Sequence, residues 1–339
     1  MAKKRIEWID IAKALGIIAV VIGHAFHPLR DNSHIISVIY TSIYWWHMPL
    51  FFIIGGFFLK PLTDTFNFKQ FIKKKIIPSL KSYFIYGSVI IIISHFIHNR
   101  SIKETITYFF KLAYGGPLLT RELTVFWFIN AMILTTILVT LMITYIKSIT
   151  AQFFIAITLF ALGVSYPNSG AFGIENMPWS IDTVLLTTLW MLLGYYIFKY
   201  YKQFKGKNIL LVSGTTLFGI LVILRYNNIL SYALYLKSHI LHNTFLGFYF
   251  STFLCLTIFI FSAKLTNFTF LKLILMKIGK HTMPIMYMHK TIFYIVSKLG
   301  LENGQTLIKI ILGISLPLIT YELYKLSKNS ILLNKKSSI

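Results

Sequence analysis

Residues 6–28 read IEWIDIAKALGIIAVVIGHAFHP, an apolar run long enough to cross a lipid bilayer as one helix. The run follows the basic start MAKKR, as a secretory signal does. However, it contains Lys13 and His24, it lacks a small-residue cleavage site, and nine further apolar runs follow it. We therefore interpret it as the first, retained helix of a polytopic membrane protein.

The composition of the whole chain supports this interpretation. Of 339 residues, 13% are charged and 56% are hydrophobic, whereas about 25% of an ordinary globular chain is charged. The apolar segments are Ile11–Leu29, Ile36–Leu59, Ile76–Phe96, Thr124–Ile146, Ala151–Tyr166, Ile181–Tyr200, Ile209–Leu224, Ile240–Ala263, His281–Leu299 and Thr306–Leu326. The sequence predicts an all-α polytopic protein with about ten transmembrane helices, folded as a single membrane domain over residues 1–339.

The excess of basic residues predicts the orientation of these helices. The chain has 33 Lys and Arg against 10 Asp and Glu, and in a membrane protein such an excess gathers in cytoplasmic loops rather than binding nucleic acid. With a cytoplasmic N-terminus, 22 basic residues fall on the inner side and 8 on the outer side. We expect a cell-membrane protein with both termini in the cytoplasm. The long outer stretches Asn99–Leu123 and Arg225–His239 have the mixed composition of interfacial or re-entrant helices.

The first helix carries three ionisable groups, which are costly inside a bilayer and are therefore functional candidates. Asp10 and Lys13 are three residues apart and can pair on one helix face. His24 lies eleven residues beyond Lys13, which places it within about 20° of the same face and about 16 Å further along the helix. We expect one stripe with an ion pair at its cytoplasmic end and an imidazole toward the outer leaflet.

A second imidazole lies in the next apolar segment, IYWWHMPLFFIIGGFFLK, residues 43–60. His47 is placed midway down the predicted second helix, and the short connection makes the first two helices neighbours. His24 and His47 are thus expected to face a common cavity, with Gly55 and Gly56 allowing close helix approach. The alternative is that either histidine only hydrogen-bonds a neighbouring helix.

Three consecutive lysines, Lys73, Lys74 and Lys75, precede the third apolar segment in FKQFIKKKIIPSLKSYFIY, residues 68–86. Three ammonium groups at one helix entrance suit a phosphate group. They equally suit a topology anchor or a contact with anionic lipid.

Six segments, taken in order, resemble the membrane-bound acyltransferase-3 family, and in particular its fucose 4-O-acetylase-like branch: IDIAKALGIIAVVIGH, WWHMPLFFIIGGF, KKKIIPSLKSYF, FWFINAM, IDTVLLTTLWMLLGYY and MPIMYMHKTIF. The most specific part is the spacing of Lys13 and His24. The resemblance implies a ten-helix acyltransferase-3-like membrane domain that moves an acyl group, usually acetyl, from cytoplasmic coenzyme A to a sugar hydroxyl.

This activity fits the residues. Lysines at the inner surface would hold the charged end of acetyl-CoA, which acts as a co-substrate rather than a tightly bound cofactor, while its slender arm reaches toward His24. Acetylation of a hydroxyl needs a base, and the pKa of free imidazole, about 6.5, suits that role. Direct transfer and an acyl-histidine intermediate both remain open. The candidate catalytic residues are His24, His47 and Asp10, and the candidate donor-binding residues are Lys13, Lys73, Lys74 and Lys75.

The acceptor would meet other side chains. Trp127 could stack on a sugar or belong to the aromatic belt of the bilayer. The resemblance implies that Tyr287 and His289 line the cavity, whereas the residues alone indicate packing. Asp182 opens a predicted helix on the outer side, where it could be a cap. No cluster has metal-ligand spacing and no phosphate loop occurs, so no metal site is expected.

The leading function is therefore O-acetylation of a cell-envelope polysaccharide or lipid-linked sugar. An exporter of polysaccharide or lipid-linked glycan is the alternative, because intramembrane His and Lys with many aromatic residues also suit a translocation path. The spacing of Lys13 and His24, together with a basic inner entrance, favours the acyltransferase, since a transporter requires neither.

Overall fold

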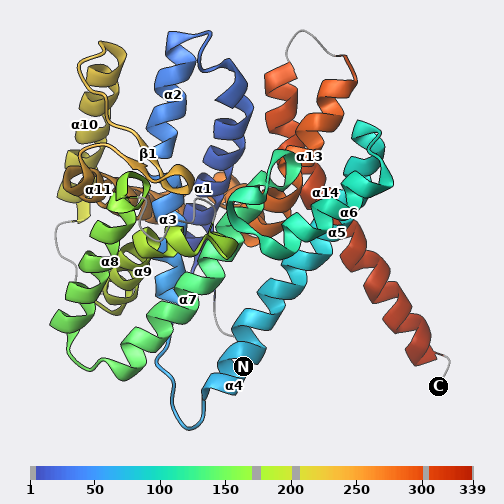
Figure 1. Ribbon diagram of the computed structural model, residues 1–339, viewed down its shortest axis with the longest axis horizontal. Coiled ribbons are helices and arrows are strands. Elements are labelled where there is room, and N and C mark those ends of the chain that lie inside the picture. The colour runs from blue at the N-terminus through green and yellow to red at the C-terminus, as the bar shows by residue number, and fades with distance from the viewer. Residues whose placement is uncertain (1–4, 170–176, 201–206, 301–304, 338–339) are drawn as a thin grey trace.

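A computed structural model describes residues 5–169, 177–200, 207–300 and 305–337, and these form a helical bundle with one short hairpin (Figure 1). The α-helices are α1 Glu7–Phe26, α2 His34–Tyr44, α3 His47–Phe57, α4 Phe68–Phe71, α5 Ile77–His98, α6 Ile102–Tyr114, α7 Trp127–Tyr145, α8 Ile149–Ser169, α9 Ile181–Tyr200, α10 Lys207–Tyr226, α11 Thr244–Leu265, α12 Thr269–Lys280, α13 Thr282–Lys298 and α14 Gln305–Ser337. The short turns are η1 His27–Leu29, the π-helical η2 Ile72–Ile76, η3 Gly116–Leu118, η4 Arg121–Phe126, η5 Pro178–Ser180 and η7 Leu236–Ser238. The strands are β1 Leu234–Tyr235 and β2 Ile240–Leu241.

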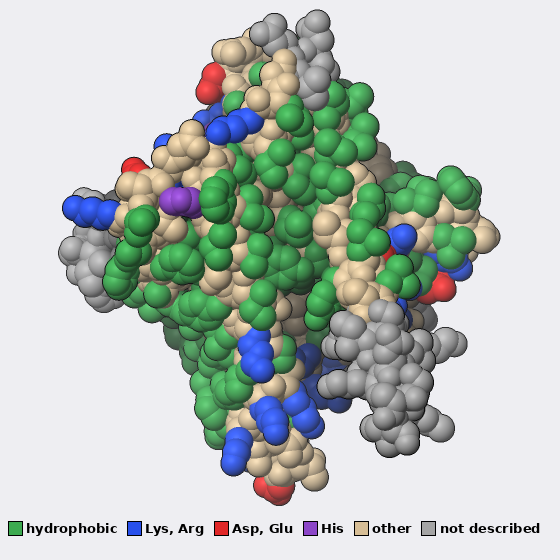
Figure 2. Space-filling view, turned by 90° about the vertical axis from the view of Figure 1, so that its right-hand side faces the viewer, with side chains coloured by type: hydrophobic (Ala, Val, Ile, Leu, Met, Phe, Trp, Pro, Cys, Tyr) green, Lys and Arg blue, Asp and Glu red, His purple; other side chains and the backbone are tan. Residues whose placement is uncertain are grey.

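The all-α polytopic fold is confirmed. In the part of the chain that the structure describes, nine helical stretches are long and apolar enough to cross a membrane. Hydrophobic side chains cover the middle of the face shown in Figure 2, while Lys and Arg gather toward its lower end, where α4 lies in Figure 1. This is the surface expected of a protein surrounded by lipid.

The ninth predicted segment is the one that falls short of a full span. It forms α13, whose 17 residues give a length of about 26 Å, against about 30 Å of bilayer hydrocarbon. Helix α13 packs against α1, α14 and η4. It is therefore held mainly by other helices.

The second predicted span is broken, which corrects the position expected for His47. Helix α2 ends at Tyr44, Trp46 has non-helical backbone angles, and α3 starts at His47. Pro49 explains the break, because a proline lacks an N–H and its ring would clash with the carbonyl of Trp45 in a continuous helix. His47 consequently lies at the start of a helix within the His34–Phe57 stretch, not midway down one helix.

The two long outer stretches differ from each other. Ser101 and Glu104 form a capping box that starts the amphipathic helix α6, so the helical expectation for Asn99–Leu123 is met there. The expectation was wrong for Arg225–His239. Beyond Tyr226 that stretch forms the first part of a hairpin, in which β1 pairs antiparallel with β2. Tertiary contacts hold it, since the Trp45 indole N–H donates to the Tyr232 carbonyl at 3.0 Å.

Two glycines let α3 and α9 touch backbone to backbone. A Cβ added to Gly56 would lie 2.1 Å from the Met191 carbonyl oxygen, and one added to Gly194 would lie 2.0 Å from that of Ile53. This confirms the close approach expected at Gly56. Gly55 instead faces the flexible side chains of Met132 and Met191.

We expect Gly56→Ala to destabilise the protein by several kcal/mol, because the two backbones must separate to admit one methyl group. Gly219→Ala is the matched control, since an added Cβ at Gly219 meets nothing within 4 Å. Thermal unfolding of both purified variants in the same detergent measures the difference. Equal unfolding temperatures would show that α3 and α9 are not held at this distance.

Candidate functional site

An apolar cavity of about 260 Å³ runs along one stripe of α1. It is lined by Lys13, Ile17, Val20 and His24, positions that share one helical face. The stripe predicted from the sequence therefore exists, and it faces a cavity. We call this the inner cavity, because it extends from His24 toward the Lys13 end of α1.

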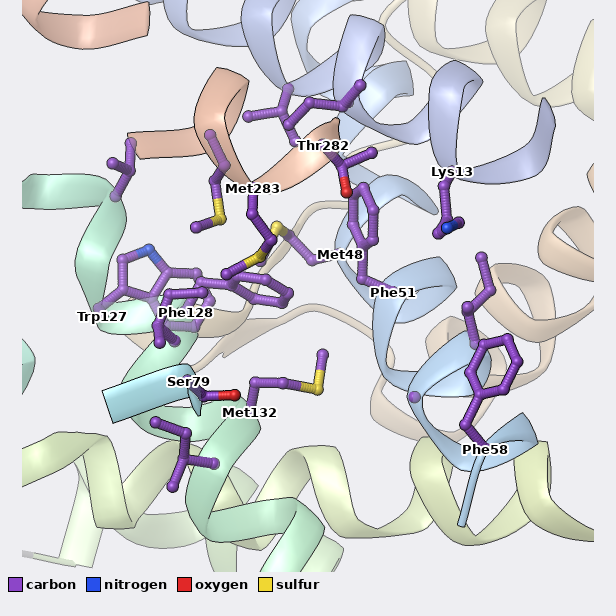
Figure 3. Close-up of a pocket in the computed structure, with 18 of the residues that line it drawn as sticks. Lys13, Met48, Phe51, Phe58, Ser79, Trp127, Phe128, Met132, Thr282 and Met283 are labelled. Atoms are coloured by element: carbon purple, nitrogen blue, oxygen red, sulfur yellow. The ribbon is translucent and has the colours of Figure 1, made fainter. Parts of the chain in front are cut away.

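The inner cavity is small, and its walls can adapt. Figure 3 shows Lys13 and Trp127 on opposite sides of it, with Met48 and Phe51 between them in this view. Four methionines contribute to its walls: Met48, Met132, Met283 and Met286. Methionine side chains are flexible and polarisable, so the walls can adjust to the shape of a bound apolar group.

A second cavity of about 900 Å³ extends from His24 toward the other end of α1. We call it the outer cavity. Its walls include His27, Arg30 and His47, the turn η4 and the hairpin segment at Lys237. His24 and His47 face this common cavity, as the sequence predicted. In contrast to the inner cavity, the outer cavity is wide and its walls carry many polar groups.

The two cavities meet at a small set of side chains. His24, Met48 and Trp127 line both of them. Trp127 begins α7 and is 8% exposed, which places its ring in the wall of the site. His24 is thus the one imidazole, among the described residues lining these cavities, that contacts both spaces.

His24 packs against a second histidine, which is fully buried. The ring centroids of His24 and His289 are 5.2 Å apart, and His289 is 0% exposed. Its Nδ1 lies 2.9 Å from the Ile285 carbonyl oxygen, which only accepts, so Nδ1 carries the hydrogen and Nε2 is an acceptor. Nε2 has no hydrogen-bond partner among the described residues. His289 is therefore placed to contact His24 rather than to line the open cavity.

His47 is fixed in the same way. Its Nδ1–H donates to the Ile43 carbonyl at 2.8 Å, which leaves Nε2 as an acceptor. Its ring meets Tyr44 edge-on at 4.6 Å. His47 thus presents a basic nitrogen at the wall of the outer cavity but does not line the inner one.

The predicted ion pair at the start of α1 is present. Lys13 Nζ lies 2.5 Å from Asp10 Oδ1, and Arg5 lies 3.7 Å from the other carboxylate oxygen. Asp10 is 4% exposed and lines neither cavity. It lies fourteen residues, about 21 Å, before His24 along α1. Asp10 therefore holds Lys13 in place and is too distant to contact a group at His24.

The remaining predicted residues lie outside the two cavities. Lys73, Lys74 and Lys75 are exposed on η2, one turn before Ser79 of the inner cavity. Tyr287 is 0% exposed and stacks on Tyr86 with ring centroids 4.6 Å apart. Tyr287 therefore packs α13 against α5 and does not line either cavity. The described residues hold no group of three or more His, Cys, Asp or Glu placed to bind a metal ion.

Sequence reasoning missed the contacts that fix the outer hairpin. His239 Nδ1 lies 2.7 Å from the Gly163 carbonyl and Nε2 lies 2.9 Å from Asp182 Oδ2. Asp182 is thus a partner for the hairpin, not a helix cap. The Lys237 ammonium donates to the Leu119 carbonyl at 3.2 Å and to Thr124 Oγ1 at 3.1 Å. The local sequence signal for these contacts was a charged residue, Lys237, within the largely apolar residues 231–241.

A bundle of membrane-spanning helices with two cavities that meet at one imidazole defines a membrane protein that either transports a solute or transfers a group between two substrates. The chain belongs to the acyltransferase-3 family: the family's model, an acyltransferase domain, matches residues 6–321. It is therefore a membrane acyltransferase, and the exporter alternative is not favoured. The chain has no significant match among curated proteins or among solved structures.

Proposed function

We propose that this protein is an O-acyltransferase that moves an acetyl group from cytoplasmic acetyl-CoA to a hydroxyl of a cell-envelope polysaccharide or lipid-linked sugar. The observation that carries the proposal is the position of His24 in the walls of both cavities. A donor in one cavity and an acceptor in the other would bring their reacting atoms together at this imidazole. The acetyl donor and the sugar acceptor in this proposal are those implied by the resemblance to the fucose 4-O-acetylase-like branch.

The inner cavity suits the donor. Its methionine-rich walls can adjust to the slender arm of coenzyme A and to the thioester sulfur at its tip. Lys13 at its far end offers an ammonium group to the phosphates. The positive-inside distribution of the chain, 22 basic residues against 8, supports a cytoplasmic location for this end and for both termini.

The chemistry follows from the histidine pair. If His24 donates its N–H to the free Nε2 of His289, its other nitrogen is an unprotonated base facing the cavities. That nitrogen takes the proton of the acceptor hydroxyl as the oxygen attacks the thioester carbonyl. The carbon–sulfur bond then breaks, and the departing sulfur takes the proton back from His24 and leaves as the coenzyme A thiol. In the alternative, the His24 nitrogen attacks the carbonyl first and the carbon–sulfur bond breaks to release the coenzyme A thiolate. The acceptor hydroxyl then attacks the acetyl-imidazole, the nitrogen–carbon bond breaks, and the hydroxyl proton passes to the thiolate.

The purified full chain, given acetyl-CoA labelled in the acetyl group, tests the proposal. Transfer of label to a cell-envelope glycan fraction, with release of one free thiol per transfer, is the expected result. Loss of glycan O-acetyl groups in a deletion strain would identify the acceptor. A protein that moves glycan across vesicles without consuming acetyl-CoA would instead be an exporter.

The lysines of η2 give a separate expectation about the donor. Replacing Lys73, Lys74 and Lys75 together with Gln is expected to raise the KM for acetyl-CoA about tenfold with kcat preserved, if they hold its phosphates. Each exposed contact is worth about 1 kcal/mol or less, so single replacements change little. Initial rates at varied acetyl-CoA measure this. An unchanged KM in the triple variant would make these lysines topology anchors.

A further inference from the structure

The outer cavity is lined by five lysine and arginine side chains. Arg30, Arg121, Lys237, Lys290 and Lys309 come from five separate segments and all reach its walls. No Asp or Glu of the described residues lines this cavity. Polar cavities that bind neutral sugars do not require such a charge.

Most of these cations lack a carboxylate partner. Arg30 lies 3.4 Å from Asp31, whereas no other lysine or arginine of this set has an ion pair within the described part of the chain. The Lys309 ammonium donates to Gln305 Oε1 at 2.8 Å, a neutral group. Cations that are partly buried among neutral partners leave a positive potential that an anion would neutralise.

The cations also repel one another. Burial, and the nearby charge of Lys290, lower the pKa of Lys237 to about 8. Lys290 in turn lies within electrostatic range of Glu122, which attracts it from outside the cavity wall, and of Lys309, which repels it. Such an arrangement is unfavourable when the cavity holds only water, and it becomes favourable when negative groups lie between the lysines.

The positive-inside rule does not account for this cluster. That rule places basic residues in inner loops, yet Arg30, Arg121 and Lys237 are three of the eight predicted outer ones, and Lys290 and Lys309 lie within predicted spans. The inner cavity, by comparison, has one lysine, Lys13, and Asp10 already pairs with it. The unpaired positive charge is therefore concentrated on the acceptor side of His24.

We propose that the acceptor is an acidic glycan, whose carboxylates or phosphodiesters bind these cations and place a neighbouring hydroxyl at His24. This inference rests on the proposed function, because it takes the outer cavity as the acceptor side. Lysine ammonium groups and arginine guanidinium groups both bind either kind of anion. Both kinds of acceptor must carry a negative charge on the sugar that bears the acetylated hydroxyl or on the sugar next to it.

Binding of three labelled probes to the full chain in neutral detergent tests this inference without turnover. The probes are a galacturonate trimer, a glycerol phosphate trimer and neutral maltotriose. We expect at least one acidic probe to bind about tenfold or more tightly than maltotriose, and this advantage to shrink with added salt. The affinity for the acidic probe is also expected to fall as the pH rises through about 8, because Lys237 then loses its proton. The better of the two acidic probes identifies the kind of anion.

The double variant Lys290→Gln/Lys309→Gln is expected to lose most of this advantage and to keep its KM for acetyl-CoA. Lys103→Gln/Lys298→Gln is the matched control, since both lysines are exposed and outside the cavity walls. Equal affinities for acidic and neutral probes would overturn the inference. Displacement of the acidic probe by phosphatidylglycerol would also overturn it, because the cavity would then be a lipid site. A raised KM for acetyl-CoA in the double variant would overturn it as well, because the cavity would then be a donor site. Failure of the proposed function is distinct, since it would appear as no acetyl-CoA consumption with any acceptor.

Discussion

Replacing His24 with alanine is expected to lower kcat for acetyl transfer by at least about 100-fold while the protein still folds in the membrane. His24 is the imidazole that contacts both cavities, and no other described base occupies that junction. The loss should fall on kcat rather than on the KM for acetyl-CoA, because the lysines proposed to hold the donor phosphates lie away from His24, at the Lys13 end of the inner cavity or outside it.

The variant His24→Gln separates catalysis from packing. Glutamine keeps a hydrogen-bond donor for His289 but cannot accept a proton near pH 7, so it should be as inactive as alanine. Rates are compared at equal amounts of folded protein, measured by gel filtration in detergent. Substantial transfer by a well-folded His24→Gln enzyme would remove His24 from the chemistry, and His47 would then be the remaining candidate base at the outer cavity.

His289 offers a related measurement. Its Nε2 is the acceptor that would orient the His24 ring, and it is 0% exposed, so it acts through His24 rather than on substrate. A positioning role would show as a changed pH profile of kcat in His289→Gln. A purely structural role would lower the unfolding temperature and leave that profile unchanged.

The stripe on α1 could be predicted from the sequence because it depends on local geometry alone. Eleven residues are close to three helical turns, so Lys13 and His24 had to share a face. The partner of His24 could not be predicted in the same way, since His289 lies 265 positions further along the chain. No local pattern reports which helices become neighbours.

The outer hairpin shows the opposite case, in which local composition misleads. The residues after Tyr226 have the aromatic and basic composition of an interfacial helix. Their structure is decided by distant groups, because Trp45 holds the Tyr232 carbonyl and Asp182 holds His239. The cations of the outer cavity come together for the same reason, and each one alone resembles an ordinary loop or helix residue.

The second large effect is expected from closing the inner cavity. Met132 lies on α7 in its wall (Figure 3). Its sulfur atom would lie 3.2 Å from a Cβ added to Gly55. Met132→Trp would place an indole in a space of only about 260 Å³, so the thioester could no longer reach His24. Acetyl transfer is expected to fall about 100-fold or more, because a misplacement of even 1 Å at a reacting centre is worth about that factor.

Met132→Leu is the matched control, since leucine keeps the volume and the apolar character and should retain most of the activity. Binding of the better acidic probe reports on folding. The outer cavity does not include Met132, so both variants should bind this probe as the unaltered protein does. Loss of transfer with glycan binding intact would therefore place the block between the donor and His24. If Met132→Trp instead bound the glycan and transferred acetyl groups at more than half the normal rate, the donor would have to reach His24 by another route, and the proposed division of the two cavities between donor and acceptor would fail.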